Sequence, residues 1–225
     1  MARISDTDLI LNPDGSVFHL GLLPDQLADT ILAVGDPGRV EQVSRNFDTI
    51  EFRNQKREFI THTGTYGGKR ISVISTGIGP DNVEIFFQEV DALVNIDLHR
   101  KEPNAVRRCL NIVRVGTSGA MQKEIEVGSL LISDQAVGLD NLMQFYNRPQ
   151  SEPQVAVCRA LQQHTGLSFV PYVTHGSDSL REKISRGIFT GHTATCPGFY
   201  APQGRQLRIP IRYRSEERRV GKECT

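Results

Sequence analysis

Three short apolar segments in the first half of the chain each stop at a glycine-rich loop, and this pattern restricts the fold more than any other feature. The segments are residues 31–34, 70–75 and 111–115, and they run into GDPGR, TGIG and GTSGA. Short apolar runs bounded by glycine or proline are typical of buried strands. We therefore expect three strands of one sheet, each followed by a loop at its carboxyl end.

Helical patterns lie between the expected strands. Residues 83–98 repeat apolar side chains at a helical period, and residues 39–43 and 152–164 also favour helices. Further strands are expected at residues 57–66, 129–137 and 167–174. Strands that alternate with helices predict an α/β fold with a mostly central sheet.

Composition excludes several classes of partner. The 225 residues are 38% hydrophobic, and 26 basic residues balance 26 acidic ones. This balance gives no reason to expect nucleic acid or an anionic membrane as partner, although a small anion needs only a few local cations. No stretch approaches about 20 apolar residues, and the N-terminus has no apolar signal-peptide region. Scattered cysteines without metal spacing fit a reducing compartment, so we expect a soluble, cytoplasmic protein.

The loops after the three strands have the chemistry of an anion site. Gly35 to Arg39 and Arg114 to Thr117 each combine glycine with an arginine, and residues 75–79 add a third glycine-rich loop. Glycine lets an oxyanion approach backbone N–H groups, and a guanidinium adds charged donors. No loop matches an ATP P-loop or a dinucleotide fingerprint. Together the loops predict a phosphate-sized anion site.

A series of motifs extends this pattern. SVFHLGL, VGDPGRV, KREF, STGIG, RVGTSGA and GFYAPQGR occur in this order between residues 16 and 213. The series resembles the uridine phosphorylase branch of the nucleoside phosphorylase-I family. The resemblance implies a single α/β domain around a central, barrel-like mixed sheet flanked by helices, incomplete here at its C-terminus.

The resemblance also assigns roles to individual residues. It implies a ribose-binding role for His19, and it implies that His19 and Arg57 extend into the neighbouring subunit's site. The family is therefore at least dimeric and usually hexameric. The phosphate-binding residues that it implies are Gly35, Arg39, Arg57, Arg114 and Thr117.

One short segment is expected to recognise the base. Uracil offers two carbonyl acceptors and one N–H donor, which the Gln203 amide and the Arg205 guanidinium can satisfy. Two positions apart, both side chains can point the same way from an extended segment. Composition alone favours another interpretation, in which both residues are ordinary polar loop residues. The resemblance implies a pyrimidine-binding Gln-x-Arg pair, with Phe199 stacking on the base.

The function implied by the resemblance is phosphorolysis of a pyrimidine nucleoside. Uridine and phosphate would give uracil and ribose 1-phosphate, with Arg39, Arg114 and Arg205 as the catalytic residues. Phosphate is then a co-substrate, and neither a cofactor nor a metal is expected. The alternatives are a purine nucleoside phosphorylase or nucleosidase of the same superfamily, and a non-catalytic nucleoside- or phosphate-binding module.

The C-terminal region departs from the family pattern. No segment after Arg205 matches the family's ribose-binding Glu-Met-Glu, so we expect the 225-residue chain to be poorly stable and nearly inactive on uridine. The letters RSEERRVGKEC at residues 214–224 resemble the translation of a common sequencing adapter. The expected organisation is an arm at residues 1–15, the phosphorylase domain at 16–213 and a non-native tail at 214–225.

Other polar residues are weaker candidates. Ser177, Asp178 and Ser179 resemble a family loop near the base pocket, but a plain turn explains them equally well. Asp134 and Asp140 could form a carboxylate pair for glycoside chemistry, although a strand and its loop account for both. Five histidines lack metal-ligand spacing and are expected in ordinary surface or core positions: His62, His99, His164, His175 and His192.

Overall fold

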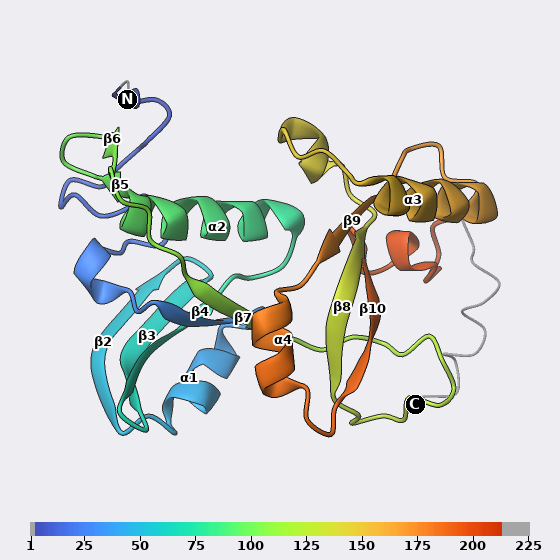
Figure 1. Cartoon of the computed structure of the whole chain (residues 1–225), viewed down its shortest axis with the longest axis horizontal. Helices are drawn as coiled ribbons and strands as arrows, with labels where there is room; N and C mark the ends of the chain where they lie inside the picture. The colour runs from blue at the N-terminus through green and yellow to red at the C-terminus, as the bar shows by residue number, and fades with distance from the viewer. Residues whose placement is uncertain (1–2, 213–225) are drawn as a thin grey trace. The chain divides into compact units, whose positions relative to one another are not determined.

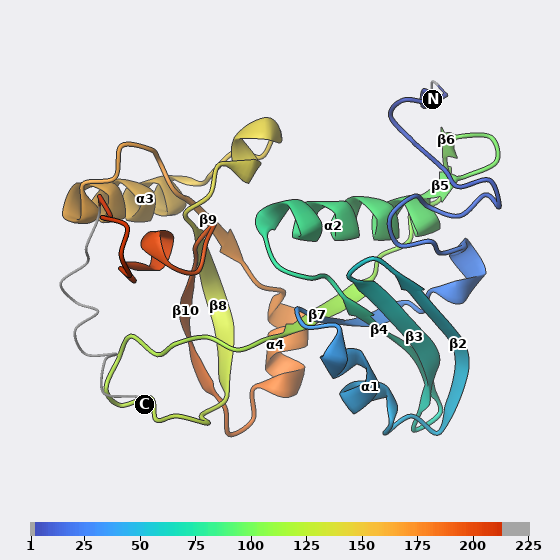
Figure 2. The ribbon, with the colours of Figure 1, turned by 180° about the vertical axis from the view of Figure 1, so that it is seen from behind.

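The computed structural model describes residues 3–212, which form two compact α/β units divided between Thr117 and Ser118 (Figures 1 and 2). The tail at 214–225, expected to be non-native, lies outside the described residues. Each unit contains its own mixed sheet and its own helices. The observed elements confirm the α/β class that the alternating strand and helix patterns predict.

The first unit is built on a five-stranded sheet with the order β2-β3-β4-β1-β7. Strands β4, β1 and β7 are parallel neighbours, whereas β2 pairs with β3 and β3 with β4 in antiparallel fashion. The sheet is therefore mixed. The strands are β1 (Thr30–Val34), β2 (Thr49–Lys56), β3 (Phe59–Tyr66), β4 (Lys69–Ser75) and β7 (Asn111–Val115).

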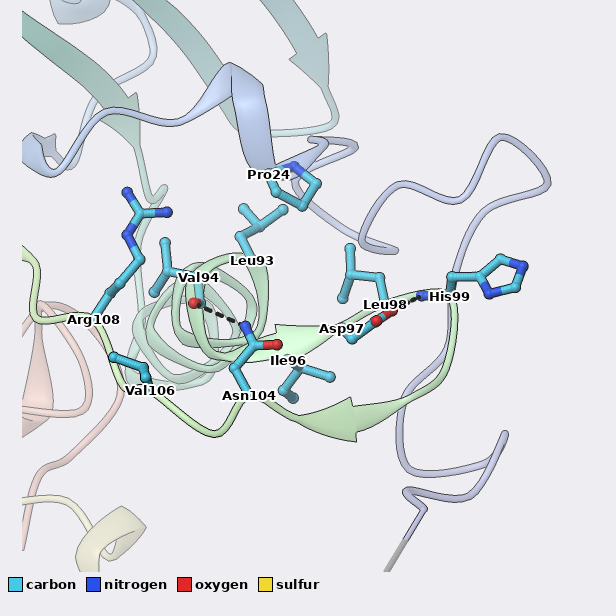
Figure 3. A pocket seen from close by; sticks show the side chains of 10 residues that line it. All are labelled: Pro24, Leu93, Val94, Ile96, Asp97, Leu98, His99, Asn104, Val106 and Arg108. Carbon is cyan, nitrogen blue, oxygen red and sulfur yellow. Dashed lines mark hydrogen bonds between the residues drawn. The ribbon is translucent and has the colours of Figure 1, made fainter. Parts of the chain in front are cut away.

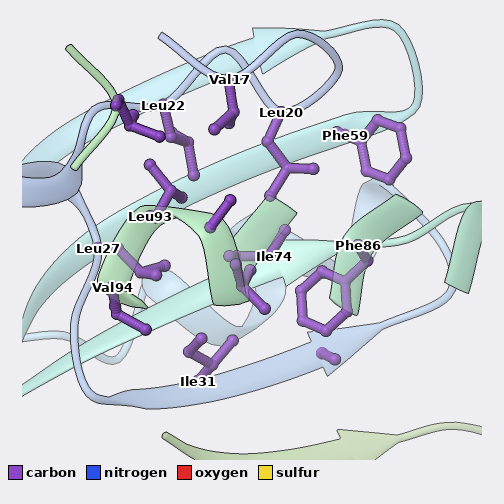
Figure 4. Packing of buried hydrophobic residues seen from close by; sticks show 14 residues of the cluster. Val17, Leu20, Leu22, Leu27, Ile31, Phe59, Ile74, Phe86, Leu93 and Val94 are labelled. Atoms are coloured by element: carbon purple, nitrogen blue, oxygen red, sulfur yellow. The ribbon is translucent and has the colours of Figure 1, made fainter. Parts of the chain in front are cut away.

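Helices cover both faces of this sheet, as expected for parallel strands that are apolar throughout. Ile31 and Ile74 face α2 (Pro80–Asn95) and pack in one cluster with Phe86 (Figure 4). On the other face, Val34 and Val73 pack against Val40 of α1 (Gly38–Ser44). The alternation of neighbouring strand residues between two apolar layers places this unit's core on both sides of β1 and β4.

The N-terminal residues are fixed to a small hairpin formed by β5 (Ile96–Asp97) and β6 (Glu102–Pro103). The Ile4 amide donates to the Lys101 carbonyl at 2.7 Å, and Lys101 Nζ donates to the Leu9 carbonyl at 2.7 Å. A short 3₁₀ helix at Pro24–Gln26 then leads toward β1.

The second unit has a three-stranded sheet with the order β10-β8-β9, in which β10 is parallel and β9 antiparallel to β8. Its longest helix is flanked by standard signals: a Ser151–Gln154 capping box and Gly166 at φ 65°. The elements are β8 (Leu131–Gly138), α3 (Glu152–Thr165), β9 (Tyr172–His175), α4 (Asp178–Ile184), β10 (Phe189–Thr195) and 3₁₀ turns at Leu142–Phe145 and Ala201–Gln203.

Two predicted elements have wrong boundaries. The helix expected at residues 83–98 begins at Pro80 and ends at Asn95, because Ile96 and Asp97 pair with β6 instead. The strand expected at residues 167–174 is confined to Tyr172–His175, where it pairs with β8. In both cases pairing with another strand decides the boundary, and the local apolar pattern carries no trace of that pairing.

Among the longer elements, β2, β10 and α4 were not predicted. In β2 the partly buried positions begin with Ile50 and Phe52 but continue with Asn54 and Lys56, so the apolar alternation is lost halfway. Asn54 and Lys56 are partly buried because they hydrogen-bond the backbone of residues 18–21. Strand β10 and helix α4 have mostly polar, exposed side chains and offer no clear periodicity.

The helix α1 is fixed to the sheet by a buried polar contact as well as by apolar packing. Ser44, its last residue, lies 2.8 Å from Nδ1 of His62 on β3. The His62 side chain is 8% exposed, and burial is the main reason that its pKa falls below the usual 6.5, with Arg53 adding to the shift and Glu41 opposing it. His62 is therefore a neutral core residue.

The packing predicts different effects for two adjacent phenylalanines. Phe86 is 1% exposed and Phe87 is 49% exposed. Phe86→Ala should lower the free energy of unfolding by about 3–5 kcal/mol because it leaves a cavity between α2 and the sheet. Phe87→Ala should cost less than about 1 kcal/mol. Urea denaturation of both variants checks this, and equal losses would contradict the assigned faces of α2.

The burial of His62 predicts a pH dependence of stability. Because the pKa is lowered in the folded state, the unfolded chain binds a proton first as the pH falls. The stability from neutral His62 is present above pH 6.5 and is lost as the pH falls below it. His62→Gln should therefore flatten the fall in stability between about pH 7 and pH 5, as measured by urea midpoints. An unchanged slope would show that burial does not control this histidine.

Candidate phosphate site and base-recognition segment

The carboxyl ends of β4, β1 and β7 lie side by side at one edge of the five-stranded sheet (Figure 1). Val34, the last residue of β1, pairs with Ser75 on one side and with Val115 on the other. The Thr76 amide then donates to the Val34 carbonyl at 2.8 Å. Parallel pairing thus brings together the three glycine-rich loops that the sequence predicts as an anion site.

Glycines in these loops leave room for the Arg114 guanidinium. A Cβ at Gly35 would lie 3.9 Å from Arg114 Nη2 and 3.7 Å from the Gly77 carbonyl. A Cβ at Gly116 would lie 2.6 Å from Arg114 Nη1, closer than real Cβ contacts allow. The guanidinium of β7 therefore lies against the loop that follows β1.

Arg39 extends the positive charge at this edge. The loop before it is turned by Asp36, whose Oδ1 accepts from the Gly38 amide at 2.9 Å. Arg39 follows in the first turn of α1 and is partly exposed, whereas Arg114 is exposed. Within residues 3–212 no carboxylate forms an ion pair with either guanidinium. Two uncompensated arginines beside glycine-rich backbone can bind an oxyanion through charge-assisted hydrogen bonds.

Arg57 and Thr117 are brought to the same part of the first unit. Arg57 lies in the tight turn between β2 and β3 at φ 55°, a conformation that few non-glycine residues adopt. The turn is fixed at the end of β4, because Ser75 Oγ donates to the Glu58 carbonyl at 2.6 Å. Thr117 is exposed two residues beyond the end of β7. All five predicted phosphate residues thus belong to this unit.

His19 is fixed by Glu89, a residue that the sequence analysis missed. His19 Nδ1 lies 2.7 Å from Glu89 Oε1, and the same carboxylate accepts from the His19 and Leu20 amides. Glu89 interrupts the buried face of α2 between Phe86 and Val90. An acidic residue at such a position is the sequence signal that could have identified it.

The base-recognition segment lies in the second unit and is not extended, contrary to the prediction. Ala201–Gln203 form a 3₁₀ turn, and Gly204 at φ 68° reverses the chain. The Gln203 and Arg205 amides both donate to the Tyr200 carbonyl, at 3.0 and 2.9 Å. Pro202 favours the turn and Gly204 permits the left-handed conformation, so both were available as sequence signals.

The compact turn determines where the Arg205 guanidinium lies. Its Cζ is 3.9 Å from the centroid of the Phe199 ring, and Phe199 in turn packs edge to face with Tyr200. Phe199 is 58% exposed. A guanidinium stacked on a ring keeps its planar N–H donors directed sideways, as recognition of a planar heterocycle requires.

The weaker candidates have structural roles. Asp134 forms an ion pair with Arg181. Asp140 accepts from the Tyr172 hydroxyl at 2.9 and 3.0 Å; burial, with this hydrogen bond, raises the pKa of Tyr172. Ser177 is the N-cap of α4 and accepts from the Leu180 amide.

The remaining histidines lie outside the predicted site. His99, His164, His175 and His192 are exposed. Among the residues described, no cluster of three or more His, Cys, Asp or Glu could hold a metal ion. No helix in the same range is long and apolar enough to cross a membrane. A cavity of about 540 Å³ lies at the C-terminal end of α2 and is lined by residues such as Leu93, Asn104 and Arg108 (Figure 3).

Comparison with solved structures supports the fold. A nucleoside phosphorylase of Trypanosoma brucei matches with a TM-score of 0.83 and 31% identity, over 89% of this chain and 72% of that one. Its description states that it shows uridine phosphorylase activity. The similarity confirms the mixed α/β fold expected from the motif series.

Comparison with curated proteins finds both pyrimidine and purine enzymes. The chain is 33% identical over 192 residues to a uridine phosphorylase of Thermococcus kodakarensis, which covers 85% of this chain and 59% of the relative. It is 35% identical over 119 residues to a DeoD-type purine nucleoside phosphorylase of Alkaliphilus metalliredigens, over 52% of this chain and 46% of the relative. The chain thus spans about half the length of these relatives.

A family model decides the membership. The model of the phosphorylase superfamily matches residues 29–220, which include the three glycine-rich loops and the segment from Phe199 to Arg205. By this match and by the solved structure that shares its fold, the chain belongs to the phosphorylase superfamily.

Proposed function

We propose that the protein catalyses phosphorolysis of a pyrimidine nucleoside, with uridine as the substrate. The observation that carries the proposal is a pair of arginines without a carboxylate partner within residues 3–212: Arg114, whose guanidinium lies against Gly35, and Arg39 in the first turn of α1. An edge of this kind is where open α/β sheets bind ligands. A phosphate dianion is the anion that membership of the phosphorylase superfamily favours.

The proposed reaction exchanges one bond at the sugar. A phosphate oxygen bonds to C1′ as the bond between C1′ and the base nitrogen breaks, which gives ribose 1-phosphate and the free base. Arg39 and Arg114 hold the nucleophile in position with help from Gly35, Arg57 and Thr117, and positioning is a large part of such catalysis. The leaving base takes the electron pair of the broken bond. No organic cofactor is needed, because phosphate is itself a co-substrate.

Recognition of the base is assigned to the turn in the second unit. Phe199 offers a ring face, Gln203 an amide and Arg205 sideways N–H donors. Donors aimed at the carbonyl oxygens of uracil stabilise the negative charge that the base gains as it leaves. The support for uridine is this set of groups, together with uridine phosphorylases among the relatives.

The proposal includes the assembly and the setting of the protein. His19 and Arg57 are assigned to a neighbouring subunit's site, so the proposed enzyme is a homo-oligomer built from dimers. We place it in the cytoplasm and in nucleoside salvage, where free base and sugar phosphate are reused. The domain at residues 16–213, preceded by an arm at 1–15, is the proposed catalytic unit.

A purine nucleoside is the second candidate substrate. It is favoured by the purine nucleoside phosphorylases among the relatives, which match about half of this chain at 35% identity or slightly less. The first unit is compatible with either base, since its contacts concern phosphate. The distinction therefore depends on Gln203 and Arg205.

The proposed function predicts base release that depends on phosphate. Purified protein should convert uridine to uracil only when phosphate is present, and faster than it converts inosine to hypoxanthine. A radiochemical assay of the released base detects even slow turnover. Faster cleavage of inosine would favour the purine enzyme, and cleavage without phosphate would favour a nucleosidase. Calorimetric binding of phosphate without any turnover would favour a binding module.

The phosphate site predicts the effect of removing either guanidinium. Arg39→Ala and Arg114→Ala should each weaken phosphate binding by at least about tenfold, because a charge-assisted hydrogen bond is lost in each. Arg45→Ala is the matched control, since Arg45 is exposed just beyond the opposite end of α1. Calorimetric titration with inorganic phosphate measures all three. Equal affinities for the three variants would place the anion elsewhere.

A further inference from the structure

The carboxylate of Glu89 makes an unusually complete set of contacts with one loop residue and its neighbour. It lies 2.7 Å from His19 Nδ1, and it accepts from the His19 amide at 2.8 Å and from the Leu20 amide at 2.7 Å. These residues are about 70 positions apart in the sequence. A distant helix therefore determines the conformation of the loop that carries His19.

These contacts are partly sequestered from water. The Glu89 side chain is 13% exposed and the His19 side chain 29% exposed, and Leu20 is fully buried. Within residues 3–212 these two backbone amides have no other acceptor, so without Glu89 they would be left unsatisfied in a half-buried place. The carboxylate thus belongs to the local fold and is more than a surface charge near a histidine.

The same loop is held from the other side by β2. Lys56 Nζ donates to the Phe18 carbonyl and to Asn12 Oδ1, the latter at 2.7 Å. Asn54 Nδ2 donates to the Leu20 carbonyl at 2.8 Å. Lys56 directly precedes Arg57. The loop that carries His19 and the turn that carries Arg57 are therefore joined by one connected set of contacts.

We propose that Glu89 is a positioning residue that fixes the tautomer and the orientation of His19. With Nδ1–H donated to the carboxylate, the neutral ring keeps its lone pair on Nε2, and no residue between 3 and 212 hydrogen-bonds that atom. Nε2 can then accept a hydrogen bond from a hydroxyl group of the nucleoside sugar. This inference rests on the proposed function, because the sugar is the ligand assigned to His19.

The proposal specifies which nitrogen of the His19 ring carries the proton, whereas a purely structural role of Glu89 does not. A carboxylate that only satisfied the two backbone amides would leave the imidazole free to populate either tautomer. A carboxylate bonded to Nδ1–H selects one tautomer, in the way that carboxylates orient histidines elsewhere. The protonation pattern of the His19 ring separates the two cases.

The test compares three proteins by long-range ¹H–¹⁵N NMR of the full chain at about pH 8.5, where free imidazole is neutral. His19→Asn identifies the His19 signals. In the unaltered protein Nδ1 should be protonated and Nε2 unprotonated. Glu89→Gln should abolish this pattern, because its one oxygen is needed by the two backbone N–H groups and its NH2 group then faces Nδ1 as a donor. Asp91→Asn, which removes an exposed carboxylate from the same helix, should preserve it.

Two results would overturn the proposal: a His19 ring protonated on Nε2 in the unaltered protein, or an Nδ1-protonated ring that persists in Glu89→Gln. Uridine binding is measured separately on the same samples. Glu89→Gln should weaken it about tenfold, but cause no further loss when His19 is already replaced. If uridine does not bind at all, the proposed function fails, whereas the NMR pattern still decides whether Glu89 positions His19.

Discussion

Parallel pairing of β1 with β4 and β7 is the constraint on which the candidate phosphate site depends. Parallel strands end at the same edge, so three loops that are about 40 residues apart in sequence become neighbours. Their apolar residues alternate between α1 and α2, and burial on both faces fixes the register. A slip of one residue would move the ends of the strands apart and exchange the two apolar layers. The same packing that stabilises the first unit therefore brings Arg114 against Gly35.

The first unit was largely predictable because its strands are short, apolar and bounded by glycine. Residues 31–34 are apolar throughout and residues 111–115 contain three apolar side chains, and the observed strands match within one residue. Prediction failed where the side chains of an element serve other segments. Asn54 and Lys56 break the apolar alternation of β2 because they hold the loop that carries His19. Contacts with this loop thus conceal the strand from the sequence pattern.

In the candidate site, too, residues with a local sequence signal could be predicted and residues with distant partners could not. Glycine and arginine after a strand have a local meaning, so Gly35, Arg39 and Arg114 could be found by inspection. Glu89 could not be assigned a role, because its partner is about 70 residues away and no local pattern connects the two. The turn at Phe199–Arg205 is an intermediate case. Pro202 and Gly204 indicate a compact turn. The prediction instead treated the segment as extended, because Gln203 and Arg205 are two positions apart and both can bind a base.

The guanidinium groups of Arg39 and Arg114 also indicate what kind of ligand the first unit can bind. Elsewhere in this unit, some exposed arginines, such as Arg70 and Arg108, form ion pairs with nearby carboxylates, whereas others, such as Arg45, form none within residues 3–212. Among the described residues, Arg39 and Arg114 have no such partner, although Asp36 is close to Arg39 in sequence. Asp36 instead turns its carboxylate to the Gly38 amide and shapes the loop. A neutralising carboxylate would compete with phosphate, so an edge that keeps its guanidinium groups unpaired is suited to an anion supplied from solution.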